Sequence, residues 1–117
     1  MRKPLKEQFE EAFTERIKKY AEGDPFLEKA LLTLNNNGIE TFGCCAGHNR
    51  SDYSYIAMRI PEPESKGYSG FKNLCNKLSQ LPNVMLTFGI SNIREKRSEF
   101  TIECSTYNRE EVFSLIT

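Results

Sequence analysis

Net charge is the property that this sequence most clearly lacks, because sixteen basic residues are balanced by sixteen acidic ones. Proteins that hold duplex DNA through its phosphates usually carry a strong excess of lysine and arginine. The composition therefore argues against a dedicated duplex-DNA binder, while it still allows a local basic patch.

Long apolar runs are also missing. No stretch approaches the about 18 residues that a membrane-spanning helix needs. The charged N-terminus, MRKPLKEQFEEAF, has no apolar segment of the kind found in secretory signals. We therefore expect a cytoplasmic protein with no membrane partner. In a reducing compartment its four cysteines are expected to be thiols or ligands rather than disulfides.

What is present is typical of one small globular domain. The chain has 117 residues, of which 38% are hydrophobic and 27% charged, and a chain of this size can fold without a disulfide or a metal. Apolar periodicity predicts helices over 4–22, 24–37 and 70–80 and after Asn108, and strands over 39–44, 53–60, 83–92 and 98–104.

This order, α-α-β-β-α-β-β-α, predicts a single α+β domain over residues 1–117. We expect two layers, a mostly antiparallel four-stranded sheet with helices packed on one face. Asp24, Ser69 and Asn108 are the expected caps of the second, third and last helices, and Gly38 is the expected left-handed residue after the second. The apolar side of the first helix consists of Leu5, Phe9, Phe13, Ile17 and Tyr20. The sequence leaves open whether this side packs on the protein's own sheet or on a partner.

Strand alternation divides the sheet into two faces. The core face is expected to carry Ser54, Ile56, Met58, Ile60, Val84, Leu86, Phe88, Ile90, Phe100, Ile102 and Cys104. The opposite face would carry Thr41, Gly43, Tyr55, Arg59, Met85, Thr87, Thr101 and Glu103. That second face is either a solvated surface, partly covered by the first helix or a dimer partner, or a ligand platform. As a platform it would use Tyr55 for stacking and Arg59 for an anion.

The stretch TFGCCAGHNR, residues 41–50, concentrates reactive side chains and contains the only histidine. Cys44, Cys45 and His48 could supply three ligands to zinc, with Cys75 or Cys104 as the fourth. The spacing argues against this, because neighbouring strand residues point to opposite sides and no C-x-x-C pair is present. A cysteine nucleophile activated by His48 is another alternative, although adjacency in sequence is not itself a catalytic signature.

Two further interpretations of the same stretch remain open. In the structural one, Cys44 and Cys45 are small buried residues and Gly47 provides a turn that a side chain could not enter. In the other, the stretch is a ligand loop in which His48, Asn49 and Arg50 supply a titratable group, an amide and a cation, a combination that suits a phosphate or carboxylate.

A second basic cluster lies in the other hairpin turn. Arg94, Lys96 and Arg97 would share one edge of the sheet with residues 48–50 if the two hairpins lay side by side. The plain alternative is a soluble hairpin tip.

The run LNNNGIETFGCCAGH, followed by YSYIAMRI, resembles a group of small microbial and phage proteins with a Cys-Cys-x-Gly-His turn. The match covers about residues 31–60. More distantly, the turn is similar to that of the wybutosine-synthesis methyltransferase family, Ser-Cys-x-Gly-Arg. Cys45, Ala46 and Gly47 fit that pattern, whereas Cys44 replaces the serine and His48 the arginine. This second resemblance implies S-adenosylmethionine binding and tRNA modification.

The leading hypothesis is binding of a small anionic, nucleotide-derived ligand at the turn 44–50. The candidate ligand-binding residues are Cys45, Gly47, His48, Asn49, Arg50, Tyr55, Arg59, Arg94 and Arg97. The phage resemblance adds that such a protein could sequester a signalling nucleotide of host defence. One alternative is an enzyme on a nucleotide or tRNA, with His48 as acid–base and S-adenosylmethionine as cofactor. Another is an interaction module that inhibits a host enzyme. A homo-oligomer is compatible with each.

Overall fold

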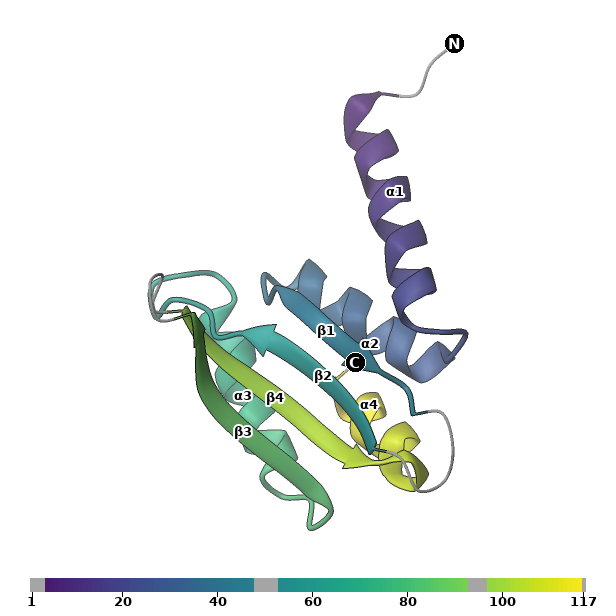
Figure 1. Ribbon diagram of the computed structural model, residues 1–117. Helices are drawn as coiled ribbons and strands as arrows, with labels where there is room; N and C mark the ends of the chain where they lie inside the picture. The colour runs from purple at the N-terminus through teal and green to yellow at the C-terminus, as the bar shows by residue number, and fades with distance from the viewer. Residues whose placement is uncertain (1–3, 48–52, 93–96, 117) are drawn as a thin grey trace.

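The computed structural model describes residues 4–47, 53–92 and 97–116, and it confirms the expected α+β class and element order (Figure 1). The helices are α1 (Leu5–Tyr20), α2 (Pro25–Asn36), α3 (Tyr68–Leu78), a 3-10 turn (Thr106–Asn108) and α4 (Arg109–Ile116). The strands are β1 (Thr41–Cys45), β2 (Tyr53–Arg59), β3 (Val84–Asn92) and β4 (Arg97–Ser105). Within the described residues, no helix is both long and apolar enough to cross a membrane.

The four strands form one antiparallel sheet in the order β1-β2-β4-β3. The two hairpins meet through β2 and β4, where Tyr53 lies opposite Ser105 and Arg59 opposite Glu99. Because these central strands run in opposite directions, Cys45 and Tyr53 lie at the opposite end of the sheet from Asn92 and Arg97. This arrangement decides which sequence-predicted residues can act together.

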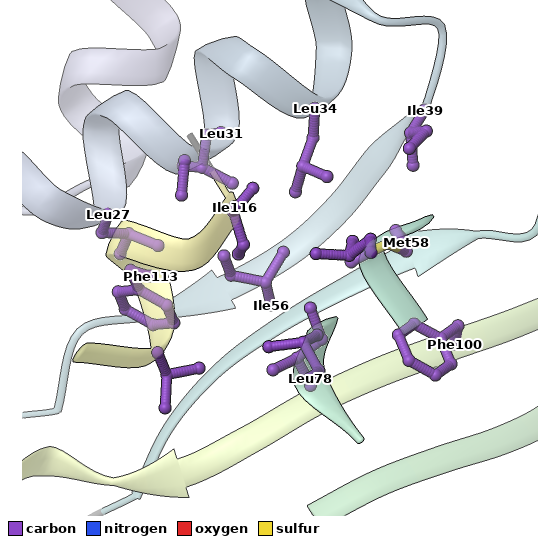
Figure 2. Close-up of a cluster of buried hydrophobic side chains, with 14 of the residues drawn as sticks. Leu27, Leu31, Leu34, Ile39, Ile56, Met58, Leu78, Phe100, Phe113 and Ile116 are labelled. Atoms are coloured by element: carbon purple, nitrogen blue, oxygen red, sulfur yellow. The ribbon is translucent and has the colours of Figure 1, made fainter. Parts of the chain in front are cut away.

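Helices α2, α3 and α4 cover one face of the sheet and enclose the core (Figures 1 and 2). Its largest fully buried side chains include Leu27 and Leu31 from α2, Phe113 from α4, and Ile56 and Phe100 from the sheet. Burial of each such side chain contributes about 1.5–3 kcal/mol to folding. The strand alternation therefore gives the correct core face over most of β2 and β4. Phe88 is an exception, because it contacts Phe100 yet remains 62% exposed in the middle of the edge strand β3.

Strand β1 contains an irregularity that the alternating pattern does not predict. Thr41 pairs with Met58 and Gly43 with Ala57, so the register shifts at Phe42 as in a β-bulge. Thr41 consequently faces the helix layer, where Asn35 Nδ2 donates to its Oγ1 at 2.9 Å. Its expected position on the opposite face was wrong for this reason.

Helix α1 joins the rest of the fold only through its C-terminal part. Ile17 and the following Ala21 are buried, whereas Leu5 and Phe9 are each 71% exposed and Tyr20 is 58% exposed. In Figure 1 the helix projects away from the sheet. The described chain thus covers only part of the apolar side expected for α1.

The helix ends agree with the sequence in one case and differ in two. Asp24 caps α2, because its Oδ1 accepts hydrogen bonds from the backbone N–H groups of Phe26 and Leu27. Helix α3 begins at Tyr68, so Ser69 lies inside it and is not its cap. Asn108 precedes α4 as expected, but its Nδ2 donates to Ser105 Oγ at 3.2 Å.

Candidate functional site

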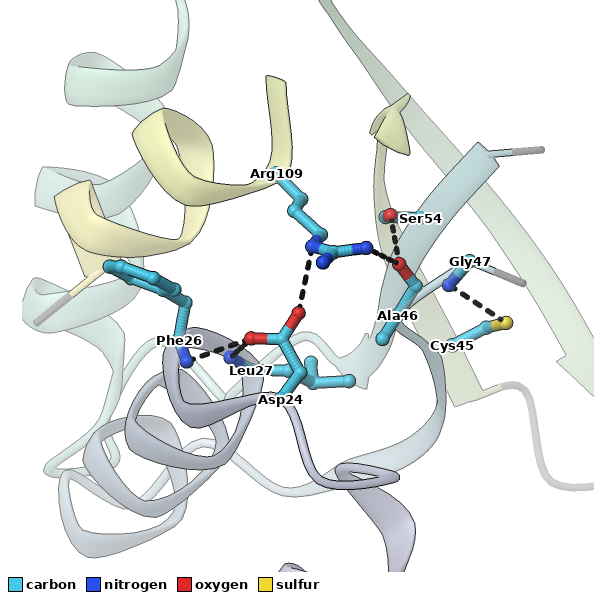
Figure 3. A network of polar contacts seen from close by, with 8 residues as sticks. All are labelled: Asp24, Phe26, Leu27, Cys45, Ala46, Gly47, Ser54 and Arg109. Carbon is cyan, nitrogen blue, oxygen red and sulfur yellow. Dashed lines mark hydrogen bonds and ion pairs between the residues drawn. The ribbon is translucent and has the colours of Figure 1, made fainter. Parts of the chain in front are cut away.

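The turn that follows β1 is held by hydrogen bonds to one carbonyl oxygen. The carbonyl of Ala46 accepts from Ser54 Oγ at 2.7 Å and from Arg109 Nη1 at 3.2 Å. The next residue, Gly47, donates its N–H to Cys45 Sγ at 3.4 Å (Figure 3). These contacts fix the chain at the point where residues 48–52 begin.

Asp24 and Arg109 extend this network into the helix layer. Arg109 Nε lies 2.8 Å from Asp24 Oδ2, and the Asp24 side chain is only 6% exposed (Figure 3). Within the described residues Oδ2 has no other hydrogen-bond partner, so the guanidinium charge is what compensates this buried oxygen. Since a buried carboxylate is costly unless it is paired, Arg109 couples the start of α2 to the turn after β1.

Gly47 occupies a position that no other residue fits. Its φ is +89°, a region that side chains rarely adopt, and a Cβ placed there would clash with Thr106 Oγ1. The prediction of a turn closed to side chains at Gly47 is confirmed.

A cleft of about 540 Å³ lies beside the edge strand β1, between the end of α1, α2 and the sheet. Three partly exposed aromatic side chains contribute to it: Tyr20, Phe42 and Tyr55, at 58%, 48% and 38% exposure. Its other lining residues are Ile17, Lys19, Glu22, Leu31, Thr41, Gly43 and Cys44. The cleft therefore offers flat apolar surfaces next to charged groups.

Gly43 gives the ring of Tyr55 access to β1. A Cβ on Gly43 would lie 3.9 Å from Tyr55 Cε2 and 3.7 Å from Ala57 Cβ. The ring thus lies against the strand where Gly43 leaves its surface bare. The register pairs Cys45 with Tyr55, so this ring is also directly opposite the residue that begins the turn.

Cys44 faces the helix side of the cleft and is a poor nucleophile. Its Sγ donates to the carbonyl oxygen of Tyr20 at 3.4 Å. Burial, with a smaller contribution from the nearby Glu22 carboxylate, raises the pKa of the Cys44 thiol to about 11. At neutral pH the group is therefore a protonated thiol, whereas nucleophilic attack needs a thiolate.

The register separates the two adjacent cysteines. Cys44 pairs with Ile56 on the core face, whereas Cys45 pairs with Tyr55 on the opposite face. A zinc site made by both sulfurs would need them directed at one point, which this strand does not provide. His48, the third ligand of that alternative, lies outside the described residues.

The structure brings together Cys45, Gly47 and Tyr55 from the predicted ligand set. His48, Asn49, Arg50 and Arg94 lie outside the described residues.

Arg59 and the backbone of Arg97, two other members of the predicted ligand set, lie at the end of the sheet away from the Cys45–Gly47 turn. Arg59 closes β2, and its Nη1 lies 3.3 Å from Glu40 Oε2. The backbone of Arg97 begins β4, whose last residue, Ser105, lies opposite Tyr53. At about 3.4 Å per residue, the length of β4 separates Arg97 from that end of the sheet by about 27 Å. The condition under which the two basic clusters would share one edge is not met, because the two hairpins run in opposite directions.

Sequence reasoning missed the residues that support and complete this site. Asp24 was recognised only as a helix cap, and no local pattern signals that Arg109 would pair with it. Tyr20, Phe42 and Lys19 enter the cleft because of the way α1 and the bulge in β1 are placed.

In comparisons with known proteins, no family model, no curated protein and no solved structure matches this chain significantly.

Proposed function

We propose that this protein binds a small anionic, nucleotide-derived ligand in the cleft beside β1. The observation that carries the proposal is the grouping of Tyr20, Phe42 and Tyr55 around one cleft, next to the fixed turn at Cys45–Gly47. A volume of about 540 Å³ is within the range of small-molecule sites, about 300–1,000 Å³.

The aromatic rings are suited to the flat part of such a ligand. Stacking of a base on an aromatic side chain contributes about 1–3 kcal/mol and tolerates any base. Tyr55 is the strongest candidate, because its ring lies against the bare surface at Gly43 and is still 38% exposed. An exposed face of this ring can receive a ligand without rearrangement of the core.

The anionic part of the ligand would be held at the rim. Lys19 is the cationic side chain among the lining residues. His48, Asn49 and Arg50 follow Gly47 directly in the sequence. We assign them a part in phosphate binding from their side-chain chemistry and from this position in the sequence. Arg59 has no part in this version of the site, since it pairs with Glu40 at the other end of β2.

Sequestration of a signalling nucleotide, as in evasion of host defence, requires binding and no reaction. The described lining residues fit this role, because the Cys44 thiol is protonated at neutral pH. The enzyme alternative rests on His48. The interaction-module alternative rests on exposed side chains such as Tyr53 and Met85, at 62% and 61%. No observation favours the enzyme alternative or the interaction-module alternative over ligand binding in the cleft.

Calorimetric titration with a panel of mononucleotides, cyclic mononucleotides and cyclic dinucleotides tests the proposal. We expect at least one member to bind with one ligand per chain, and Lys19→Ala to weaken that binding about 3–10-fold. Arg59→Ala is the matched control, because it removes a cation outside the cleft, and it should leave affinity unchanged. Absence of binding across the panel by the folded protein would overturn the proposal.

A further inference from the structure

Helix α1 presents an apolar stripe that its own described chain leaves uncovered. Leu5 and Phe9 are each 71% exposed and Tyr20 is 58% exposed. At about 100° per residue, these three positions fall within about 60° of one another around the helix. Ala12 lies beside them and is also exposed. This face continues through the exposed Arg16, which interrupts the apolar stripe between Ala12 and Tyr20, and it lies on a different side from the buried Ile17.

The first half of α1 is exposed to solvent throughout its described part. All described side chains from Leu5 to Ala12 are exposed, and burial begins only at Phe13 and Thr14. Isolated helices of about 12–15 residues are marginal in water, and most helical stability in proteins comes from packing of an apolar face. A helix of 16 residues held at one end thus gains most from a partner that covers its stripe.

The charges of α1 are segregated along its length. Between Leu5 and Ala12, three glutamates accompany one lysine, whereas between Phe13 and Tyr20 one glutamate accompanies three basic residues. An acidic start and a basic end suit the helix dipole, which explains the order of the charges but not the exposed stripe. The same order makes the helix complementary to a second copy of itself in the antiparallel direction.

We propose that α1 forms a homodimer interface by pairing antiparallel with α1 of a second copy, with the two helices crossing near Ala12. Each acidic half then lies beside a basic half, and Leu5 meets Tyr20 of the second copy. Phe9 meets Arg16 of the second copy, a pairing that allows a cation–π contact. A parallel pair would instead place like charges together. Two-fold self-complementarity of this kind is the commonest arrangement in soluble oligomers.

Sedimentation equilibrium of the full chain tests the interface. We expect the wild type to be a dimer at micromolar concentrations, and Phe9→Glu to raise the dimer dissociation constant at least 100-fold. Gln8→Glu is the control, because it adds the same charge beside the stripe, and it should stay dimeric. A monomeric wild type, or a dimer that Phe9→Glu does not weaken, would overturn the proposal. Circular dichroism of each variant shows that the fold is retained.

Disulfide trapping tests the direction. In the antiparallel pair two Ala12→Cys side chains lie close to the crossing point, whereas two Leu5→Cys side chains are about 22 Å apart at 1.5 Å per residue. We expect Ala12→Cys to form a covalent dimer above the wild-type background and Leu5→Cys not to do so. Cross-linking of both variants would indicate a parallel pair and contradict the proposal. Tyr20 lines both the cleft and the proposed interface, whereas Phe9 and Ala12 do not line the cleft, so trapping without ligand tests the interface separately from ligand binding.

Discussion

Arg109 at the start of α4 and Asp24 at the start of α2 form an ion pair, with Nε 2.8 Å from Oδ2. The same guanidinium donates to the carbonyl of Ala46 through Nη1. One side chain thereby compensates a buried carboxylate and holds the turn beside the proposed ligand site.

Removal of Arg109 alone should lower the free energy of unfolding more than removal of both Arg109 and the Asp24 charge. Arg109→Met leaves the Asp24 carboxylate buried without its cation, and we expect a loss of about 2–4 kcal/mol in the free energy of unfolding. Asp24→Asn combined with Arg109→Met should recover part of this loss, because no uncompensated charge remains. Urea unfolding of the two single variants and the double variant measures the coupling. Additive effects would show that the pair is energetically unimportant.

Gly23 and Gly47 have similar positive φ angles but different surroundings. Their alanine variants therefore distinguish the cost of backbone strain from the cost of a steric clash. Gly23 has a φ of +83°, and a Cβ added to it would have nothing within 4 Å, whereas a Cβ at Gly47 would clash with Thr106 Oγ1. We expect Gly23→Ala to cost about 1–2 kcal/mol from the left-handed backbone alone. Gly47→Ala should cost about 1–3 kcal/mol more because its neighbours must move. Thermal or urea unfolding checks this, and equal losses would contradict the packing at Gly47.

The thiols of the half-buried Cys44 and the buried Cys104 should react slowly with alkylating agents and should make the fold less stable at high pH. Burial raises the pKa of Cys44 and of Cys104 from 9.0 to about 11. At pH 8 each then holds about 100-fold less thiolate than an ordinary thiol. We therefore expect iodoacetamide to modify them about 100-fold more slowly in the folded protein than in urea, with peptide mass spectrometry as the readout. Equal rates in both states would contradict the burial.

The same shift fixes the sign of the pH dependence. Above about pH 9 the unfolded thiols lose their protons while the folded ones keep them, so the unfolded state binds fewer protons. The contribution of these protonated thiols to the free energy of unfolding is therefore complete below about pH 9, and it is lost as the pH rises through about 11. Urea midpoints across this range should fall, and they should fall less in Cys104→Ala.

Features encoded within a few residues were predictable from the sequence. Asp24 before Pro25 predicts the start of α2, and Gly38 predicts its end, as the φ of +83° at Gly38 confirms. Alternation in β2 and β4 gives the correct core face for Ile56 and Ile102. These signals work because caps, left-handed turns and two-residue periodicity are local properties of the chain.

Features that depend on distant parts of the chain were not predictable. The bulge at Phe42 reverses the orientation of Thr41, and only pairing with β2 reveals it. The apolar periodicity of α1 is real, yet it does not say that Phe9 remains exposed. The direction of the second hairpin, which removes Arg97 from the site, follows from pairing between β2 and β4.

Binding of a nucleotide-derived ligand in the aromatic cleft beside β1 is our proposed function for this protein. The most direct test is calorimetric titration of the best ligand of the panel into wild type, Tyr55→Ala and Tyr53→Ala. Tyr53 is the matched control, because it lies on the same face of β2 and outside the cleft. We expect Tyr55→Ala to weaken binding about tenfold or more and Tyr53→Ala to leave it unchanged. Equal affinity of Tyr55→Ala and wild type would contradict the proposal.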